Sequence, residues 1–246
     1  MGKQSKELIS SSEIFTCLRK HLIEQRPVTL YNTYQGVPVR TEAEVAMVSE
    51  AAIGLIVHPY QAVCIKFERR TFIESKSLPK LIRAYPSSID YTNQVVLLKK
   101  LKVPHAIQVD LYHSWVKPDK AIDVEIVTKD EQAYASQLQG IAVLDDNRVR
   151  VVMTLPEDTP IVRGDKLSVG FQLEEETDAI HVKGKVHSLI KIRNQDAKRL
   201  EMDGRAEMED EITILAYIAR REDQIMKALD KTYKKLRKGK IPVRRK

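Results

Sequence analysis

Histidines and carboxylates are the residues of this chain whose chemistry would first suggest a metal site or a catalytic centre. The histidines stand at positions 21, 58, 105, 113, 181 and 187. His181 and His187 are six residues apart, so a strand through both would place them on one face. No cysteine or carboxylate supports this pair at metal-ligand spacing, and the run Glu174–Glu176 lies in a polar connector. We expect structural or surface histidines, hydrated carboxylates and no metal.

Catalytic motifs are missing from the sequence. It contains no Gly-x-Ser-x-Gly nucleophile elbow, no Gly-x-x-x-x-Gly-Lys-Ser/Thr phosphate loop and no His-Glu-x-x-His zinc helix. The chain is therefore not expected to be an enzyme or to carry a cofactor.

The positive charge of the chain is concentrated at its C-terminal end. Of the 41 Lys and Arg residues, nine lie in residues 231–246, which contain no acid, and this leaves 32 basic against 34 acidic residues elsewhere. Two interpretations of this basic tail are open: a solvated, partly disordered extension, or a segment that attracts an anionic partner. Such a partner would be a nucleic acid, an acidic protein or a membrane surface. Only Tyr233 interleaves the tail's cations, which gives little support for stacking on bases.

Composition and termini predict a cytoplasmic protein. No run of about 18 apolar residues is present, so no membrane-spanning helix is expected. The first residues carry lysines but no apolar core of a signal peptide. Cys17 and Cys64 are isolated, as reduced thiols of a cytoplasmic protein would be.

A helix followed by a β-barrel is expected over residues 1–102. Ser10 and Glu13 have the spacing of a capping box, and Ile14, Leu18 and Leu22 form a helical stripe. The pattern then changes to short β-type runs separated by Gly and Pro. These runs are Val28–Tyr34, Val37–Val48, Ala52–His58, Gln61–Phe67 and Ser88–Leu98.

A second barrel is expected over residues 121–230, after a linker at 103–120 that contains Pro104 and Pro118. Within that linker, Ile107, Val109 and Leu111 alternate as a strand would. The barrel strands are predicted at Ala121–Val127, Tyr134–Leu144, Val149–Leu155, Lys166–Leu173, Ala179–Ile192 and Ala197–Met202. The fold class is thus mainly β: two small β-barrel domains with an N-terminal helix and a long C-terminal helix.

The last element is predicted to be a long helix. Met208, Ile212, Leu215, Ala219, Met226, Leu229, Tyr233 and Leu236 follow heptad spacing, interrupted by Glu222. Ile214, Ile218 and Ile225 widen the first part of the stripe, which suits packing on a barrel. The narrower part, with Met226, Leu229, Tyr233 and Leu236, is a candidate surface for a protein partner or a homo-oligomer. The alternative is a helix docked on its own domain.

The order of strands and turns in the second half resembles the PilZ domain, a six-stranded barrel that binds the bacterial second messenger cyclic di-GMP. The resemblance covers roughly residues 105–230. It is carried by the stretch Gly140–Leu173 with its Asp145 turn, the Gly-Asp-x-Leu-x-Val-x-Phe run at 164–171 and the closing helix at 216–225. The first half resembles the motif-poor barrel that precedes PilZ in flagellar-brake-type receptors. This resemblance implies bacterial signalling that concerns motility or surface life.

The resemblance also indicates where a nucleotide would bind. The family motif Asp-x-Ser-x-x-Gly aligns with Asp145, Asn147 and Arg150, so one of its three signature residues is retained. The family's Arg-x-x-x-Arg segment aligns with residues 116–120, which supply Lys117 and Lys120 but no guanidinium fork. Arg148 or Arg150 could bind phosphate in a different geometry. The candidate ligand residues are Lys117, Lys120, Asp145, Asn147, Arg148 and Arg150.

Two functions from different classes follow from these observations. The first is a degenerate PilZ adaptor that binds another protein through its C-terminal helix and tail. The alternative is a cyclic di-GMP receptor in which the ligand changes the relative orientation of the two barrels.

Overall fold

The computed structural model describes residues 10–78, 80–104, 111–145, 148–174, 178–193 and 195–239, apart from the side chains of residues 11, 135, 137, 139, 141 and 145. The chain divides into two compact units. The first comprises Met1–Tyr112 together with Ile225–Lys246, and the second comprises His113–Gln224. The sequence predicts that the C-terminal helix belongs to the second barrel up to residue 230. In this division, the residues from Ile225 onward belong to the first unit.

The first unit begins with helix α1 (Ser11–Glu24), which has the predicted capping box. The Glu13 backbone N–H donates to the Ser10 hydroxyl at 3.2 Å, and the Ser10 backbone N–H donates to the Glu13 carboxylate at 2.7 Å. These hydrogen bonds hold the pKa of Glu13 below its ordinary value. Ile14 and Leu18 of the predicted stripe are buried in the core of the first barrel. The helix ends at Gln25, which adopts a left-handed conformation two residues before Pro27.

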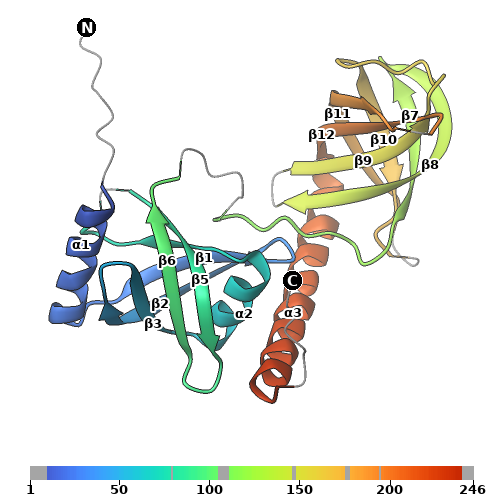
Figure 1. Ribbon diagram of the computed structural model, residues 1–246. Coiled ribbons are helices and arrows are strands. Elements are labelled where there is room, and N and C mark those ends of the chain that lie inside the picture. Colours follow the sequence, from blue (N-terminus) through green and yellow to red (C-terminus); the bar gives the residue numbers. More distant parts are fainter. Residues whose placement is uncertain are drawn as a thin grey trace, which may run out of the picture. The chain divides into compact units, whose positions relative to one another are not determined.

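The first barrel is closed and antiparallel (Figure 1). Its strands are β1 (Val28–Tyr34), β2 (Val37–Val48), β3 (Ala52–Val57), β4 (Thr71–Glu74), β5 (Ile82–Asp90) and β6 (Val95–Lys102). They follow each other around the barrel in the order β1, β2, β3, β6, β5, β4. The run predicted at Ser88–Leu98 is the hairpin between β5 and β6, and β4 was not predicted.

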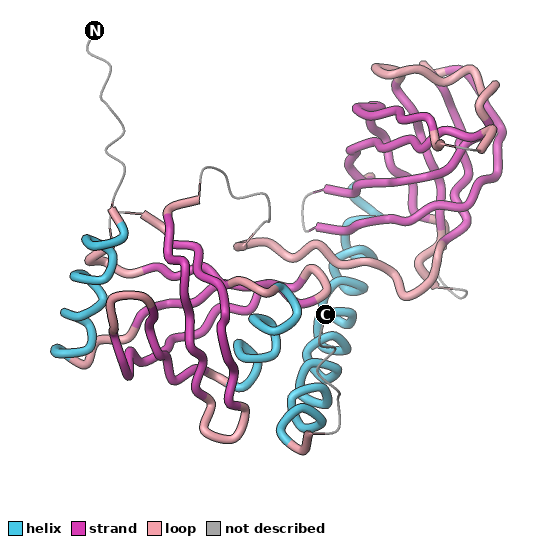
Figure 2. The backbone as a smooth tube through the Cα atoms, viewed as in Figure 1, coloured by secondary structure: helices cyan, strands magenta, loops and turns pink. Residues whose placement is uncertain are grey.

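The prediction of a strand at Gln61–Phe67 is wrong, because these residues belong to helix α2 (Pro59–Glu68). Figure 2 shows this helix as a cyan segment against the first barrel. Gln61 through Ile65 are all buried, and a short apolar run of this kind does not distinguish a buried helix from a buried strand. Pro59 occupies the first turn, where the ring suits the helical backbone, and the His58 side chain caps the N-terminus. These two residues are the local signal that favoured a helix.

A buried polar network fastens α2 to the barrel. The Asn32 amide on β1 donates to the Glu68 carboxylate at 2.5 Å and to the Arg70 carbonyl at 2.8 Å. The Gln61 amide donates to the Asn32 side-chain oxygen at 2.7 Å, and the Thr41 hydroxyl donates to Gln61 at 3.2 Å. Asn32 and Gln61 are both fully buried, so each depends on these partners for hydrogen bonding.

The second barrel is also closed and antiparallel, with every predicted strand present. Its strands are β7 (Ile122–Lys129), β8 (Gln132–Asp145), β9 (Arg148–Pro156), β10 (Lys166–Phe171), β11 (Ile180–Lys191) and β12 (Ala197–Ala206), in the order β10, β11, β12, β9, β8, β7. The prediction of a mainly β chain with two barrels is therefore confirmed. Residues 107 and 109, expected to alternate in the linker, lie outside the described residues.

Helix α3 (Met208–Arg237) confirms the predicted long C-terminal helix. Its last part packs on the first barrel: Leu229, Tyr233 and Leu236 are buried in a cluster with Val39, Val63 and Cys64, and Met226 packs against it. The four side chains expected to bind a partner thus pack on α2 and β2 of the chain's own first unit. The first part of the predicted tail, up to Arg237, is helical, whereas residues 240–246 lie outside the described residues.

The first part of α3 exposes apolar side chains. Met208 is 84 % exposed, Ile212 is 75 % exposed and Leu215 is 46 % exposed. Ile214, Ile218 and Ile225, which widen the predicted stripe, are buried. The helix therefore buries one edge of its apolar stripe in this region and leaves the heptad edge accessible.

Candidate functional site

The segment before β7 pairs with the end of β8, next to the turn that carries the degenerate motif. The Val116 N–H donates to the Leu144 carbonyl at 3.0 Å, and the Leu144 N–H donates to the Val116 carbonyl at 2.9 Å. Val116 is fully buried, as is Leu144. The two parts of the chain that were expected to form a ligand site are therefore held side by side.

Arg150 is engaged by its neighbours in the second barrel. Its Nε donates to the Asp203 carboxylate on β12 at 2.8 Å, and its guanidinium carbon lies 5.2 Å from the centre of the Trp115 ring. His187 contacts the same carboxylate, with Nδ1 at 3.4 Å. Arg150 thus links the segment before β7 to β12, and its charge is balanced by protein groups.

The two candidate lysines have exposed side chains, while the backbone around them is tied to α3. The Lys117 carbonyl accepts a hydrogen bond from Arg221 Nε at 3.1 Å, and Asp119 forms an ion pair with Arg221. Arg221 also donates to Gln224 at 3.0 Å. Lys120 is exposed at the rim of a cleft. The role of Arg221 could not be predicted from sequence, because Lys117 and Asp119, to which it binds, are about 100 residues away along the chain.

The remaining candidates lie at the turn between β8 and β9. Asp145 pairs with Arg148 across the hairpin, and the Arg148 side chain is exposed. The Asp145 side chain and the whole of Asn147 lie outside the described residues. Lys117 and Lys120 thus lie on the segment before β7, and Arg148 and Arg150 lie on β9 of this hairpin.

A cleft of about 1080 Å³ opens on the second barrel beside this segment. Lys120, Tyr217, Arg220 and Arg221 line it, together with carboxylates of β7 and Glu174. Arg220 pairs with Glu174 at 2.9 Å and lies 5.8 Å from the centre of the Tyr217 ring. Burial raises the pKa of Tyr217. The cleft therefore combines guanidinium groups and a phenol ring with carboxylates, and these carboxylates partly neutralise the positive charge of the guanidinium groups.

His181 and His187, the two histidines of β11, contact different groups. His181 lines the cleft, and its backbone N–H donates to Asp210 at 2.7 Å. His187 lies between two carboxylates, with Nε2 at 3.5 Å from Glu201 and Nδ1 at 3.4 Å from Asp203. Among the described residues, no group of three or more His, Cys, Asp or Glu side chains could hold a metal ion. None of the described helices has the length and apolar character that crossing a membrane requires.

Comparison with known proteins finds similarity only among solved structures. No protein-family model matches the sequence, and no curated protein matches it. The MrkH–cyclic di-GMP complex of K. pneumonia is 14% identical, with a TM-score of 0.37, and the match covers 90% of this chain and 97% of that one. The inhibitor of motility MotI/DgrA of Bacillus subtilis is 14% identical, with a TM-score of 0.36 and coverage of 81% and 97%.

A third structure, the PlzA protein of Borreliella burgdorferi in complex with cyclic di-GMP, is 14% identical, with a TM-score of 0.27 and coverage of 87% and 94%. At TM-scores below 0.5, these likenesses do not decide what the chain binds.

Proposed function

We propose that this chain is a non-enzymatic PilZ-like signalling protein that acts as an adaptor, through binding to another protein, and that it does not require cyclic di-GMP. The observation that carries the proposal is the state of Val116. This residue stands at the first arginine position of the family's clamp segment, and it is fully buried and hydrogen-bonded to Leu144. A guanidinium there would have to be desolvated without a carboxylate partner, which is strongly unfavourable. The position serves the core instead of a ligand.

Arg150 supports the same proposal. It stands where the family motif has glycine, and its side chain spans from Trp115 to Asp203. A ligand approaching the hairpin would have to displace an ion pair and a stacked ring before gaining any contact of its own. This cost lowers the affinity that the remaining lysines, as flexible point charges, could provide.

The exposed edge of α3, formed by Met208, Ile212 and Leu215, is the surface that we assign to the protein partner. Its heptad spacing fits an amphipathic helix, which would bury these side chains in a two-helix seam. The flanking residues Glu209 and Glu211 are exposed and acidic, so the partner helix should carry cations beside its apolar stripe. This assignment replaces the segment 226–236 as the main contact, because Leu229, Tyr233 and Leu236 are already covered by the first barrel.

Calorimetric titration with cyclic di-GMP is the direct test of the first half of the proposal. We expect no heat of binding up to millimolar ligand, with circular dichroism as the check that the chain is folded. A saturable heat that disappears in Lys120→Ala and Arg150→Ala would show that the adaptor proposal is wrong.

The assignment of the partner surface is tested by replacing Leu215 with a photo-crosslinking amino acid in the source cells. We expect one prominent crosslinked protein, lost when Ile212 is changed to Asp. Ile190→Asp is the matched control, since Ile190 is an exposed isoleucine on β11. Equal crosslinking in both variants would contradict the assignment of the surface. Light scattering at several concentrations distinguishes a second copy of this chain from a different partner.

A cyclic di-GMP receptor remains the second candidate, favoured by the pairing of Val116 with Leu144. This pairing holds Lys117 beside the hairpin of Arg148 and Arg150, in the order that the family uses. Arg221 could replace the missing clamp arginine once Asp119 releases it. In this case ligand binding would control motility or surface behaviour, and Arg221→Ala would abolish the calorimetric signal.

A further inference from the structure

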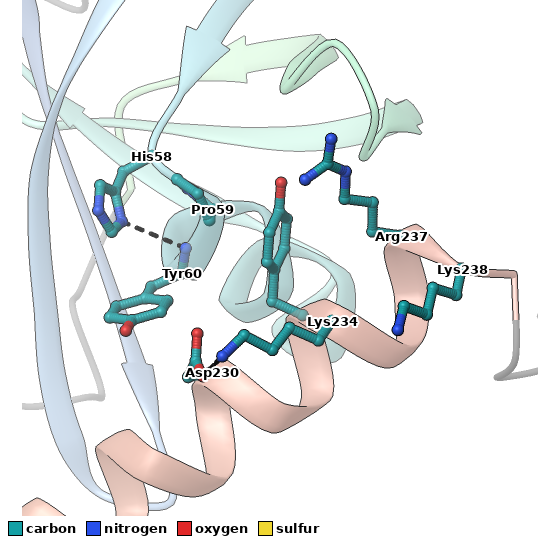
Figure 3. A pocket seen from close by; sticks show the side chains of 8 residues that line it. His58, Pro59, Tyr60, Asp230, Lys234, Arg237 and Lys238 are labelled. Carbon is teal, nitrogen blue, oxygen red and sulfur yellow. Dashed lines mark hydrogen bonds and ion pairs between the residues drawn. The ribbon is translucent and has the colours of Figure 1, made fainter.

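We propose that the first unit contains a second, separate binding site, a pocket for a mononucleotide between α2 and the last turns of α3. The pocket has a volume of about 440 Å³. Figure 3 shows His58, Pro59 and Tyr60 at the start of α2 on one side, and Lys234, Arg237 and Lys238 of the C-terminal helical end on the other. All of these residues belong to the first unit, so the pocket is independent of the candidate ligand residues of the second barrel.

The charge of the pocket favours an anion. Three cations line it against one carboxylate, Asp230, which lies 2.6 Å from Lys234 Nζ. This contact raises the pKa of Lys234, so its ammonium stays charged at neutral pH. Arg237 and Lys238 are exposed, and among the described residues no ion pair or hydrogen bond engages either side chain. Their charges are therefore available to phosphate oxygens, for which Arg offers a bidentate contact.

The opposite side of the pocket offers aromatic surfaces and a hydrogen-bond donor. The rings of His58 and Tyr60, at the start of α2, meet edge to face with centres 4.8 Å apart. Tyr233 lies on α3, beside the cations, and its hydroxyl donates to the Tyr91 carbonyl at 3.1 Å. His58 Nδ1 accepts from the Tyr60 N–H at 3.2 Å, so in the neutral ring the proton is on Nε2. That N–H could donate to a ligand oxygen, and the half-buried Tyr60 ring lines the pocket, where a base could stack on it.

The volume of the pocket favours a mononucleotide over a cyclic dinucleotide. Its volume lies toward the lower end of the range for small-molecule sites, which suits one base with its sugar and phosphates better than a cyclic dinucleotide. The phosphates would lie at Arg237 and Lys238, and the base against Tyr60. The positive end of the α2 dipole adds a weaker attraction for the anion.

The test is a fluorescence anisotropy titration of the full chain with N-methylanthraniloyl-GTP, without divalent cations. We expect saturable binding, competition by unlabelled GTP and a loss of about tenfold or more in affinity in the double variant Arg237→Ala, Lys238→Ala. The matched control is Lys231→Ala, Lys235→Ala, which removes the same charge from exposed positions on the same helix that do not line the pocket. Equal losses in the two double variants would overturn the proposal, because they would indicate attraction to the helix as a whole.

The contribution of the Tyr60 ring to binding can be measured separately. Tyr60→Ala should weaken binding of the nucleotide and leave the inhibition constant of inorganic tripolyphosphate unchanged. No saturable binding, tripolyphosphate competing as well as GTP, or a single-stranded oligonucleotide competing better than GTP would each overturn the mononucleotide assignment. The proposed adaptor function would survive any of these results, since it depends on the second barrel and the first part of α3.

Discussion

Asn32 is predicted to be the residue on which the packing of α2 depends most. Changing Asn32 to Ala removes two donated hydrogen bonds, to Glu68 at 2.5 Å and to the Arg70 carbonyl at 2.8 Å, and the one accepted from Gln61 at 2.7 Å. A neutral hydrogen bond contributes about 1 kcal/mol net and one to a charged group about 1.5–3 kcal/mol. Gln61 is fully buried, so its orphaned amide adds a desolvation cost. We expect the free energy of unfolding to fall by about 3–5 kcal/mol.

Urea denaturation followed by far-UV circular dichroism measures this loss. With a slope of about 2 kcal/mol per molar urea, the midpoint should fall by roughly 1.5–2.5 M. Trp115 is the single tryptophan and belongs to the second unit, so its fluorescence reports that unit separately. Asn93→Ala is the matched control, because Asn93 is exposed and its side-chain amide donates to the exposed Asp90 carboxylate at 2.7 Å, so its cost should be within about 0.5–1 kcal/mol.

A double-mutant cycle separates the hydrogen bonds from the cavity that the truncation creates. Asn32→Leu leaves the Gln61 amide without its acceptor, and Gln61→Leu leaves the Asn32 oxygen without its donor. The double variant removes both groups of this pair, which joins β1 to α2. The two changes should therefore cost at least about 1 kcal/mol less together than the sum of the single costs. Additive costs, or a loss below about 1 kcal/mol for Asn32→Ala, would refute the reasoning that this network holds α2 on the barrel.

Three further outcomes are expected. Gly184→Ala should destabilise the chain by about 1–3 kcal/mol in calorimetry, because the added Cβ would lie 2.5 Å from a backbone oxygen of β12, whereas Gly170→Ala, with 3.6 Å to its nearest neighbour, should cost less. Burial raises the pKa of the Cys64 thiol, so Ellman's reagent should modify the partly exposed Cys17 in the native protein and Cys64 only after unfolding. Burial and a hydrogen bond to a carboxylate raise the pKa of Tyr31 from 10.0 to about 12. The folded state therefore holds this proton more tightly, and stability that is complete below pH 10 should fall as the pH rises toward about 12, less so in Tyr31→Phe.

Strands β7 and β9 of the second barrel could be predicted because each shows a period of two. In β7, Ile122, Val124 and Ile126 are buried and alternate with exposed residues, which is the pattern of a strand with one face in a core. The residues of α2 offer no such alternation. Gln61 is as deeply buried as its apolar neighbours because Asn32, distant in sequence, satisfies its amide. A residue-by-residue hydrophobic pattern cannot represent that pairing.

The candidate ligand residues remain a prediction, and the sequence could not reveal which partners their side chains already have. The resemblance assigns the segment before β7 and the β8–β9 hairpin to one candidate site, and Val116 of that segment pairs with Leu144 of β8. Whether Arg150 is available to a ligand depends on Asp203, which is brought to it by the register between β9 and β12. Register of this kind is set by the packing of the whole barrel, so local sequence could not reveal that Arg150 already has a partner.

The heptad pattern of α3 shows the same limit and leads to a functional consequence. One stripe runs through the helix in sequence, yet Leu229 and Leu236 are buried on the first barrel, whereas Ile212 and Leu215 are exposed. A wide apolar stripe can bury either of its edges, and Ile218 lies on the edge that is buried in the first part of the helix. The accessible edge keeps heptad spacing, and no described part of the chain covers Met208, Ile212 or Leu215. Since burying large apolar side chains is favourable by about 1.5–3 kcal/mol each, this edge is where an adaptor would gain most from a second helix.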